Sequence, residues 1–185
     1  MKKILCCLLM FCLMSTVIGG VLAEETSESA YDAFLLKKGV LISKEYIKES
    51  TVDAKSSGGY DYPIDLKIVT LMDIETKEIY KCLQMSLELY NGRNFADTTI
   101  TLDADEVDSA ITAFQYMADQ ISEKSLKDYT ELVYMTNDGT SFYLTYSASD
   151  GFSFVVRNSG GVQYYDVSTL AKLAEHLTDV KPKLD

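Results

Sequence analysis

Two hydrophobic periods follow one another along this chain in a fixed order, and that order is the strongest constraint on its fold. Residues 64–72 place apolar side chains at every second position, which predicts a β-strand with one buried face. Residues 107–121 instead carry an apolar stripe at helical spacing. Further strands are predicted at 39–49, 79–90 and 98–102. The first half of the chain is therefore predicted to form four strands followed by a helix.

The second half repeats this order with shorter strands. They are predicted at 131–136, 141–147, 152–157 and 162–165, and Asx-Gly or Asn-Ser-Gly-Gly turns separate them. Such turns supply the positive φ that tight hairpins need, which predicts a four-stranded antiparallel meander. A final helix begins near residue 168, and its apolar positions match those of the first helix at an offset of 63 residues. We predict an α+β fold, in which an antiparallel sheet built from two ββββα units carries two main helices.

The N-terminus predicts export. Lys2 and Lys3 precede an apolar run at 4–18, and Val21 and Ala23 stand before two glutamates, as at a signal-peptidase site. Residues 1–23 are therefore predicted to be a signal peptide, with an uncleaved membrane anchor as the competing interpretation.

One globular domain is predicted after the signal peptide, which places the protein in the periplasm or outside the cell. It would comprise an N-terminal segment with a short helix at 24–38, a first half at 39–123 and a second half at 124–185.

Cleavage of the signal peptide would remove three cysteines and leave Cys82 alone. No internal disulfide and no cysteine-based metal site is then expected. Cys82 lies on the less apolar face of its strand, so an intermolecular disulfide and a buried, inert thiol both remain open. Loss of Lys2 and Lys3 would change the formal net charge from −11 to −13. A field of that sign repels phosphates and anionic lipids, which predicts neither a nucleic-acid partner nor a membrane partner.

The densest group of acids lies where the fourth strand meets the helix and consists of Asp103, Asp105, Glu106 and Asp108. Asp103 is predicted to cap the helix and Glu106 to complete a capping box. A calcium loop starting at Asp103 would need a glutamate at its twelfth position, which is Phe114. Asp105 and Asp108 are expected to face water. No metal, no cofactor and no catalytic residue is predicted.

The only histidine, His176, lies near the end of the last predicted helix, where the helix dipole favours a positive charge. It is assigned that structural role. The two turn aspartates, Asp138 and Asp150, are assigned to hairpin turns.

Tyrosine is the candidate binding residue, since the chain has thirteen tyrosines and no tryptophan. Tyr143 alternates with Phe142 and Leu144, so it should point to the opposite side of the sheet. Tyr134 and Tyr164 belong to the same predicted sheet. Tyr143, Tyr134 and Tyr164 are predicted to offer contact area to a protein or glycan partner. The alternative is that these rings pack beneath a helix.

Four strands and a helix, twice over about residues 39–178, resemble the tandem β4α plan of the Whirly and PUR-type single-strand nucleic-acid-binding proteins. The resemblance concerns element order and includes no functional motif, so it implies a fold and no site. The overall style is also similar to that of small exported proteins of gut bacteria.

The sequence favours an exported, non-catalytic binding or interaction module of the bacterial periplasm or cell surface, with ligand and oligomeric state open. The alternatives are a secreted hydrolase whose carboxylates converge only in the fold, and an envelope-assembly subunit.

Overall fold

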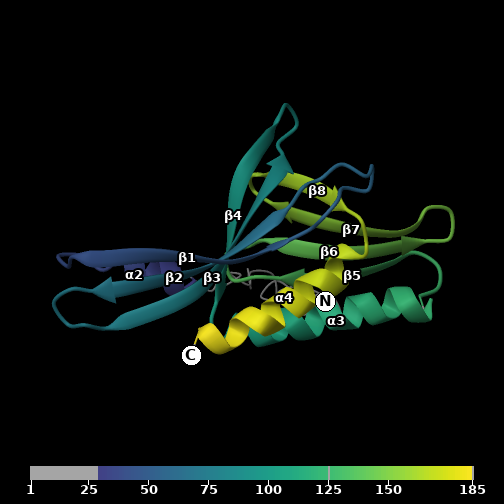
Figure 1. The fold of residues 1–185 in the computed structure, drawn as a ribbon. Coiled ribbons are helices and arrows are strands. Elements are labelled where there is room, and N and C mark those ends of the chain that lie inside the picture. Colours follow the sequence, from purple (N-terminus) through teal and green to yellow (C-terminus); the bar gives the residue numbers. More distant parts are fainter. Residues whose placement is uncertain (1–28, 125, 185) are drawn as a thin grey trace, which may run out of the picture.

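The structure is a computed structural model that describes residues 29–184 apart from residue 125, and the predicted signal peptide lies outside the described residues. Eight strands form one sheet of antiparallel pairs, and helices α3 and α4 lie side by side against one of its faces (Figure 1). This arrangement confirms the predicted α+β class. The elements are α2 (Ala30–Leu35), β1 (Ile42–Val52), β2 (Ile64–Asp73), β3 (Ile79–Tyr90), β4 (Phe95–Asp103), α3 (Glu106–Glu123), β5 (Thr130–Met135), β6 (Ser141–Ser147), β7 (Gly151–Asn158), β8 (Gly161–Tyr165), α4 (Thr169–Val180) and the short 3-10 helix η1 (Lys181–Lys183).

The sheet consists of two parts. In the first sheet part, β1–β4, strand β3 pairs with both β2 and β4, while β1 pairs with β2. In the second sheet part, β5–β8, each strand pairs with the next one along the chain, which confirms the predicted meander. We call the face of either part that is turned toward α3 and α4 its inner face, and the opposite one its outer face.

One hydrophobic core joins the inner faces to the two long helices. The helical stripe predicted from residue 107 onward is buried in α3, and α4 adds a stripe of its own. Each large apolar side chain that leaves water here stabilises the fold by about 1.5–3 kcal/mol. Fully buried examples are Leu66, Leu83, Phe142 and Phe154 from the sheet, and Phe114, Leu170 and Leu173 from the helices.

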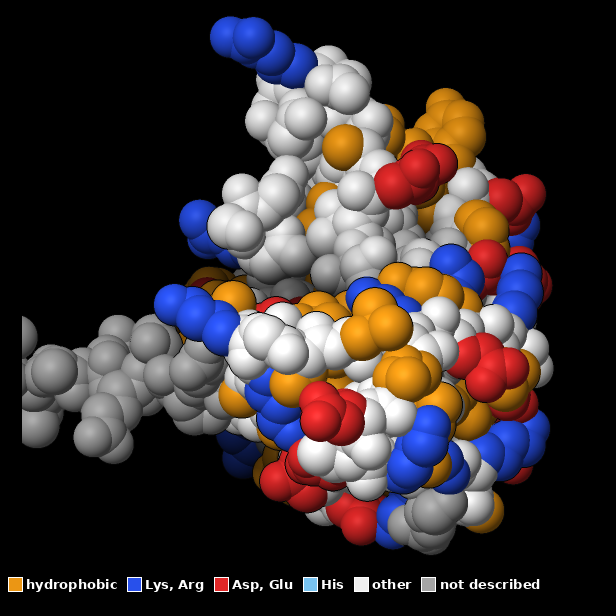
Figure 2. Space-filling model, turned by 90° about the vertical axis from the view of Figure 1, so that its left-hand side faces the viewer, with side chains coloured by type: hydrophobic (Ala, Val, Ile, Leu, Met, Phe, Trp, Pro, Cys, Tyr) orange, Lys and Arg blue, Asp and Glu red, His pale blue; other side chains and the backbone are white. Residues whose placement is uncertain are grey.

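Helix α2 covers one region of the outer face of the first sheet part. Its Tyr31 and Phe34 pack on Val69, Leu71 and Cys82 in a second, smaller apolar cluster. Burial raises the pKa of the Cys82 thiol to about 12, so the buried, inert thiol is the alternative that the structure supports. Figure 2 faces this end of the molecule and shows acidic and basic side chains interspersed with exposed hydrophobic ones.

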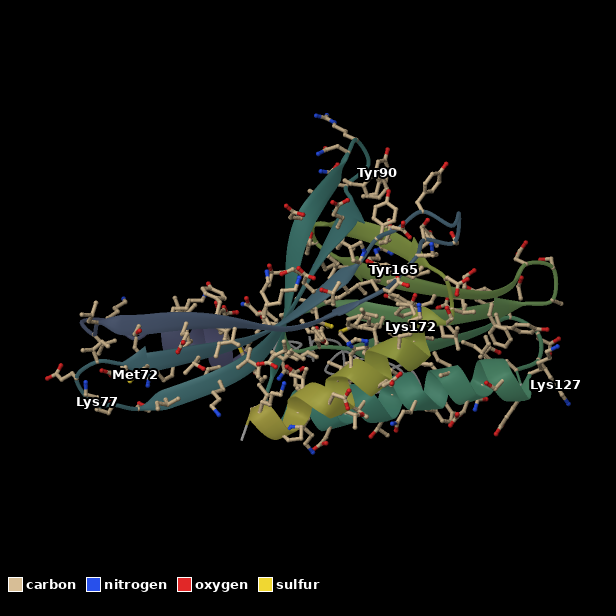
Figure 3. The ribbon with its side chains drawn as sticks, in the orientation of Figure 1. Met72, Lys77, Tyr90, Lys127, Tyr165 and Lys172 are labelled. Carbon is tan, nitrogen blue, oxygen red and sulfur yellow. The ribbon has the colours of Figure 1, made fainter. Side chains whose placement is uncertain are left out.

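The two sheet parts meet at a single residue pair, Tyr90 of β3 opposite Val162 of β8. Tyr90 lies at the raised end of the β3–β4 hairpin (Figure 3). A Cβ atom on the neighbouring Gly161 would lie 2.5 Å from the carbonyl oxygen of Tyr90. Only glycine therefore lets β8 approach β3 this closely.

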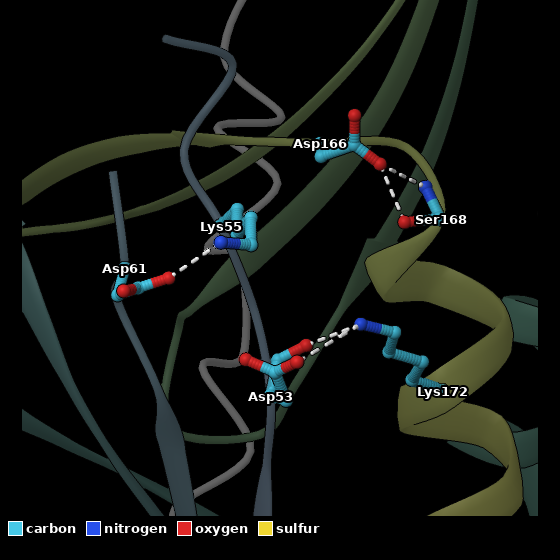
Figure 4. Close-up of polar contacts among 6 residues, drawn as sticks. All are labelled: Asp53, Lys55, Asp61, Asp166, Ser168 and Lys172. Atoms are coloured by element: carbon cyan, nitrogen blue, oxygen red, sulfur yellow. Dashed lines mark hydrogen bonds and ion pairs between the residues drawn. The ribbon is translucent and has the colours of Figure 1, made fainter. Parts of the chain in front are cut away.

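Residues 53–62 form a second link between the parts. The backbone N–H of Ser57 donates to the carbonyl oxygen of Tyr164, at 3.0 Å, which adds a short stretch of pairing to β8. On the same segment, Asp53 contacts the helix: its carbonyl oxygen accepts a hydrogen bond from Lys172 Nζ, at 2.5 Å (Figure 4). The segment thus ties the end of β1 to β8 and α4.

Some predicted boundaries are wrong by a few residues. The first strand was predicted at 39–49 but runs Ile42–Val52, because the chain turns at Gly39, whose φ is +78°. Helices α3 and α4 begin 63 residues apart, at Glu106 and Thr169, as the offset requires. The strands before them differ, since β4 has nine residues and β8 has five. An exact two-unit repeat is therefore not established.

Candidate functional site

A groove of about 780 Å³ lies over the outer face of the second sheet part. Strands β5–β8 form its floor, and the turns at 90–92 and 158–161 form a wall at one end. We call it the tyrosine groove, because it is lined by Tyr90, Tyr129, Tyr143 and Tyr164.

Strand pairing places an apolar and aromatic row on the outer face, and three of its four residues, Tyr143, Val155 and Tyr164, line the groove floor. The row runs Val133, Tyr143, Val155 and Tyr164, with each residue directly opposite the next. Side chains opposite one another in an antiparallel sheet have Cβ atoms about 4.5–5.5 Å apart and contact each other. Val133 is 48% exposed and Tyr164 is 53% exposed. The row therefore presents a continuous contact surface to solvent.

The structure brings two of the three predicted tyrosines together. Tyr143 and Tyr164 both line the groove. Tyr134 does not, which corrects its place in the predicted set. It pairs with Phe142, so it shares the inner face and packs edge-on against Phe114 of α3, with ring centroids 5.8 Å apart. Its hydroxyl lies 3.1 Å from Ser109 Oγ, and burial raises its pKa. Packing beneath a helix was the alternative for the tyrosines, and it holds for Tyr134 alone among these three.

Side-chain amides shape the groove wall. Asn91 Oδ1 accepts hydrogen bonds from the backbone N–H groups of Arg93, at 3.0 Å, and Asn94, at 3.1 Å. Asn158 Oδ1 accepts one from the N–H of Gly160, at 2.7 Å. Asparagine stabilises turns in this way because its side chain replaces a backbone acceptor. Both turns of the wall are therefore held by local hydrogen bonds.

Two charged side chains, Glu131 and Arg157, also line the groove. Within the part of the chain that the structure describes, neither forms an ion pair. The Tyr129 hydroxyl donates a hydrogen bond to the Glu131 carboxylate, and this bond raises the pKa of Tyr129.

Sequence reasoning missed Tyr90, Tyr129, Glu131 and Arg157. The alternation that identified Tyr143 also places Glu131 and Arg157 on the same face, once the hairpin register is known. Tyr90 carries no such signal, because its position depends on pairing with a strand far away in the sequence.

The acidic cluster at the start of α3 has a structural role that differs from the predicted one. Glu106 accepts the backbone N–H of Asp103 at 3.0 Å, which is one half of the predicted capping box. The Asp103 carboxylate turns instead to α2 and accepts the backbone N–H groups of Ala30, at 2.8 Å, and Tyr31, at 3.3 Å. Glu106 also accepts the N–H of Asn137, at 2.7 Å, and burial raises its pKa. Both acids are buried, and each stabilises the fold by accepting hydrogen bonds from backbone N–H groups.

The other sequence candidates lie apart from the groove. Asp105 and Asp108 are exposed, as expected, and Asp108 pairs with Lys181. His176 Nδ1 lies 3.0 Å from Ser50 Oγ. Asp138 and Asp150 accept hydrogen bonds within their hairpin turns, which confirms those assignments.

In residues 29–184 without residue 125, no three His, Cys, Asp or Glu side chains are arranged to hold a metal ion. No helix in that part of the chain is both long enough and apolar enough to cross a membrane.

No known family model matches the sequence, and no curated protein matches it. The solved structures that are similar in fold include two plant proteins. WHY1 from Arabidopsis thaliana has 13% sequence identity and a TM-score of 0.30, over 78% of this chain and 85% of WHY1. The plant transcriptional regulator PBF-2 has 16% identity and a TM-score of 0.25, over 78% of this chain and 82% of that one. The chain therefore resembles Whirly-type proteins in topology, whereas nothing supports the resemblance to gut-bacterial proteins.

These neighbours correct one expectation. Nucleic acid was excluded as a partner on the basis of net charge, but one of these two structures is that of a plant transcriptional regulator. The exclusion is therefore wrong as it stands. Likeness at this level concerns the fold alone and assigns no nucleic-acid site to the tyrosine groove.

Proposed function

We propose that this chain is an exported interaction module that binds an extended segment of a partner protein in the tyrosine groove. The observation that carries the proposal is the row of Val133, Tyr143, Val155 and Tyr164. These strands bury their inner face under α3 and α4 while this row stays open to solvent. A contiguous apolar surface of this kind is typical of a contact site for another molecule.

The side chains of the groove are those that contribute most to protein interfaces. Tyrosine buries a large ring at a small cost in rotamer entropy and keeps a hydroxyl for hydrogen bonds, and arginine and tyrosine are enriched among the residues that dominate binding energy. An extended segment could lay side chains on the Val133–Tyr164 row while its backbone meets the tyrosine hydroxyls. A glycan is the second candidate, because hydroxyls and the amide of Asn158 line the same groove.

The proposal is tested by replacing Tyr164 with a photo-crosslinking phenylalanine derivative and irradiating cells that export the protein. The matched control carries the same group at Tyr116 of α3, which is 56% exposed against 53% for Tyr164. We expect a discrete protein adduct from position 164 and none from position 116. Adding Tyr143→Ala to the position-164 protein should remove the adduct, since the ring opposite Val155 is then lost.

Equal adducts from both positions, or an adduct that survives Tyr143→Ala, would contradict the proposal. Purified protein is tested in parallel against a glycan array and a single-stranded oligonucleotide. Binding of either that Tyr143→Ala abolishes would assign the groove to that ligand class instead. A stoichiometric complex recovered through position 164 would identify the chain as an assembly subunit.

A further inference from the structure

The two charged residues of the groove lie on opposite sides of Tyr143. Glu131 is opposite Thr145 on β6, and Tyr143 is opposite Val155 on β7. Arg157 is opposite Ser141, so Glu131 and Arg157 are the two charged residues among the four diagonal neighbours of Tyr143 on the outer face, and they lie at opposite corners. Diagonal neighbours in an antiparallel sheet lie about 7–8 Å apart, so the Cα atoms of Glu131 and Arg157 are about 15 Å apart with Tyr143 between them.

Arg157 is one of the basic residues that form no ion pair within the described part of the chain. Within the described residues, several lysines form ion pairs, for example Lys37 with Glu78 at 2.7 Å, whereas the Arg157 guanidinium has no such partner. The chain has only two arginines. Arg157 lines the groove, and Arg93 belongs to the turn that closes its wall. In a protein with 28 acidic residues, this cation faces a groove whose single acid is far from it.

The charge arrangement limits what can lie in the groove. A guanidinium binds a carboxylate through two parallel N–H donors, and the Glu131 carboxylate favours a cation. An extended chain covers about 15 Å in four to five residues. We infer that the partner segment carries an acidic side chain that binds Arg157 and, four residues away on the same face of the extended chain, a basic side chain that binds Glu131. An aliphatic or aromatic side chain between them lies over Tyr143. This inference rests on the proposed binding function of the groove.

The inference is tested with short synthetic peptides, blocked at both ends and labelled for fluorescence anisotropy. The probe has Glu and Lys flanking Val-Tyr-Val and is made in both sequence orders, because the direction of the bound chain is open. The controls have Lys at both positions or Glu at both. The wild-type protein should bind the better of the two mixed peptides about tenfold more tightly than either control, since like charges placed together weaken binding.

Charge reversal in the protein makes the test specific. Arg157→Glu should prefer the peptide with two lysines, and Glu131→Lys should prefer the peptide with two glutamates. The double variant again carries one charge of each sign, so it should prefer the mixed peptides. In each variant, the preferred peptide should bind about tenfold more tightly than the others. A merely structural role of either side chain would not produce this exchange of preference, and unchanged thermal unfolding of the variants would show that they fold.

Identical peptide preferences in all four proteins would overturn the inference. If Tyr143→Ala then weakened every peptide alike, the proposed binding function would stand and only the charge pattern would be wrong. If no peptide bound the wild-type protein, the inference would be wrong as well, and crosslinking at position 164 would decide the proposed function separately.

Discussion

The two sheet parts share one core but differ in what lies over their outer faces. On the first part, α2 covers the region of the outer face that carries Val69 and Leu71, both fully buried, and leaves the polar region around Lys67 and Glu88 open. On the second part, the corresponding face carries Tyr143, Tyr164, Thr145, Glu131 and Arg157 and lines a groove. An aliphatic face must be covered to be stable in water, whereas tyrosine, threonine and charged side chains tolerate exposure. The composition of an outer face therefore distinguishes a packing surface from a contact surface in this fold.

The same difference appears at two aspartates 63 residues apart. Asp103, before α3, is 3% exposed and accepts hydrogen bonds from the start of α2. Asp166, before α4, is exposed and accepts the backbone N–H of Ser168, at 2.9 Å, next to its own helix. Asp103 thus anchors the helix that covers its sheet part, whereas Asp166, whose sheet part has no such helix among the described residues, stabilises a turn.

The largest predicted effect comes from removing the anchor of α2. Asp103→Ala leaves the N–H groups of Ala30 and Tyr31 without their acceptor, and an unsatisfied buried donor costs about 1–3 kcal/mol. We expect the free energy of unfolding to fall by about 2–4 kcal/mol. Loss of the cover should also expose Cys82. Urea unfolding measures the first effect, and the rate of reaction with a thiol reagent at neutral pH measures the second.

In the wild-type protein, Cys82 should react with a thiol reagent very slowly, because its thiol is buried and its pKa is raised to about 12. The matched control is Asp166→Ala, which should leave Cys82 protected. Rapid modification of the wild-type thiol, or equal protection in Asp103→Ala, would show that α2 does not shield the first sheet part as described.

A second comparison separates the two faces of the second sheet part. Tyr134→Ala removes a half-buried ring that packs on Phe114, and it should lower the free energy of unfolding by about 2–3 kcal/mol. Tyr143→Ala acts on the solvent side and should cost less than about 1 kcal/mol. Thermal unfolding of the two variants side by side measures the difference. Equal losses would mean that Tyr143 contributes to packing as much as Tyr134 does. The main reason for assigning Tyr143 to a binding surface would then be gone.

Local patterns in the sequence were sufficient for most of the fold. The stripe from Val107 to Met117 and the Asx-Gly turns specify α3 and the meander, because each depends on residues close together in the chain. Asp103 shows where this fails. Its spacing to Glu106 is that of a capping box, but its carboxylate binds α2, and no local pattern reveals a partner so distant in sequence.

The candidate site was only partly accessible from the sequence for a related reason. Alternation within β6 placed Tyr143 correctly on the outer face. The same rule, carried across the hairpin to β5, would have placed Tyr134 on the inner face opposite Phe142. The groove wall at Tyr90 requires the contact between β3 and β8, which Gly161 permits and which is not encoded by any periodicity.

The smallest predicted effect concerns Asp166. Its carboxylate is held by the hydroxyl and N–H of Ser168, and these hydrogen bonds lower its pKa below the ordinary aspartate value. A lowered pKa means that the folded state favours the charged form, so the stabilisation is present above the unfolded-state pKa and is lost as pH falls through the folded-state pKa. Asp166→Ala should cost about 0.5–1 kcal/mol at neutral pH, as for other acceptors next to a helix start, and nothing at strongly acid pH. Urea unfolding of wild type and variant along a descending pH series measures this. A loss at neutral pH as large as that of Asp103→Ala would mean that the two aspartates have equal structural weight, and the contrast between a covered and an open sheet part would then need another explanation.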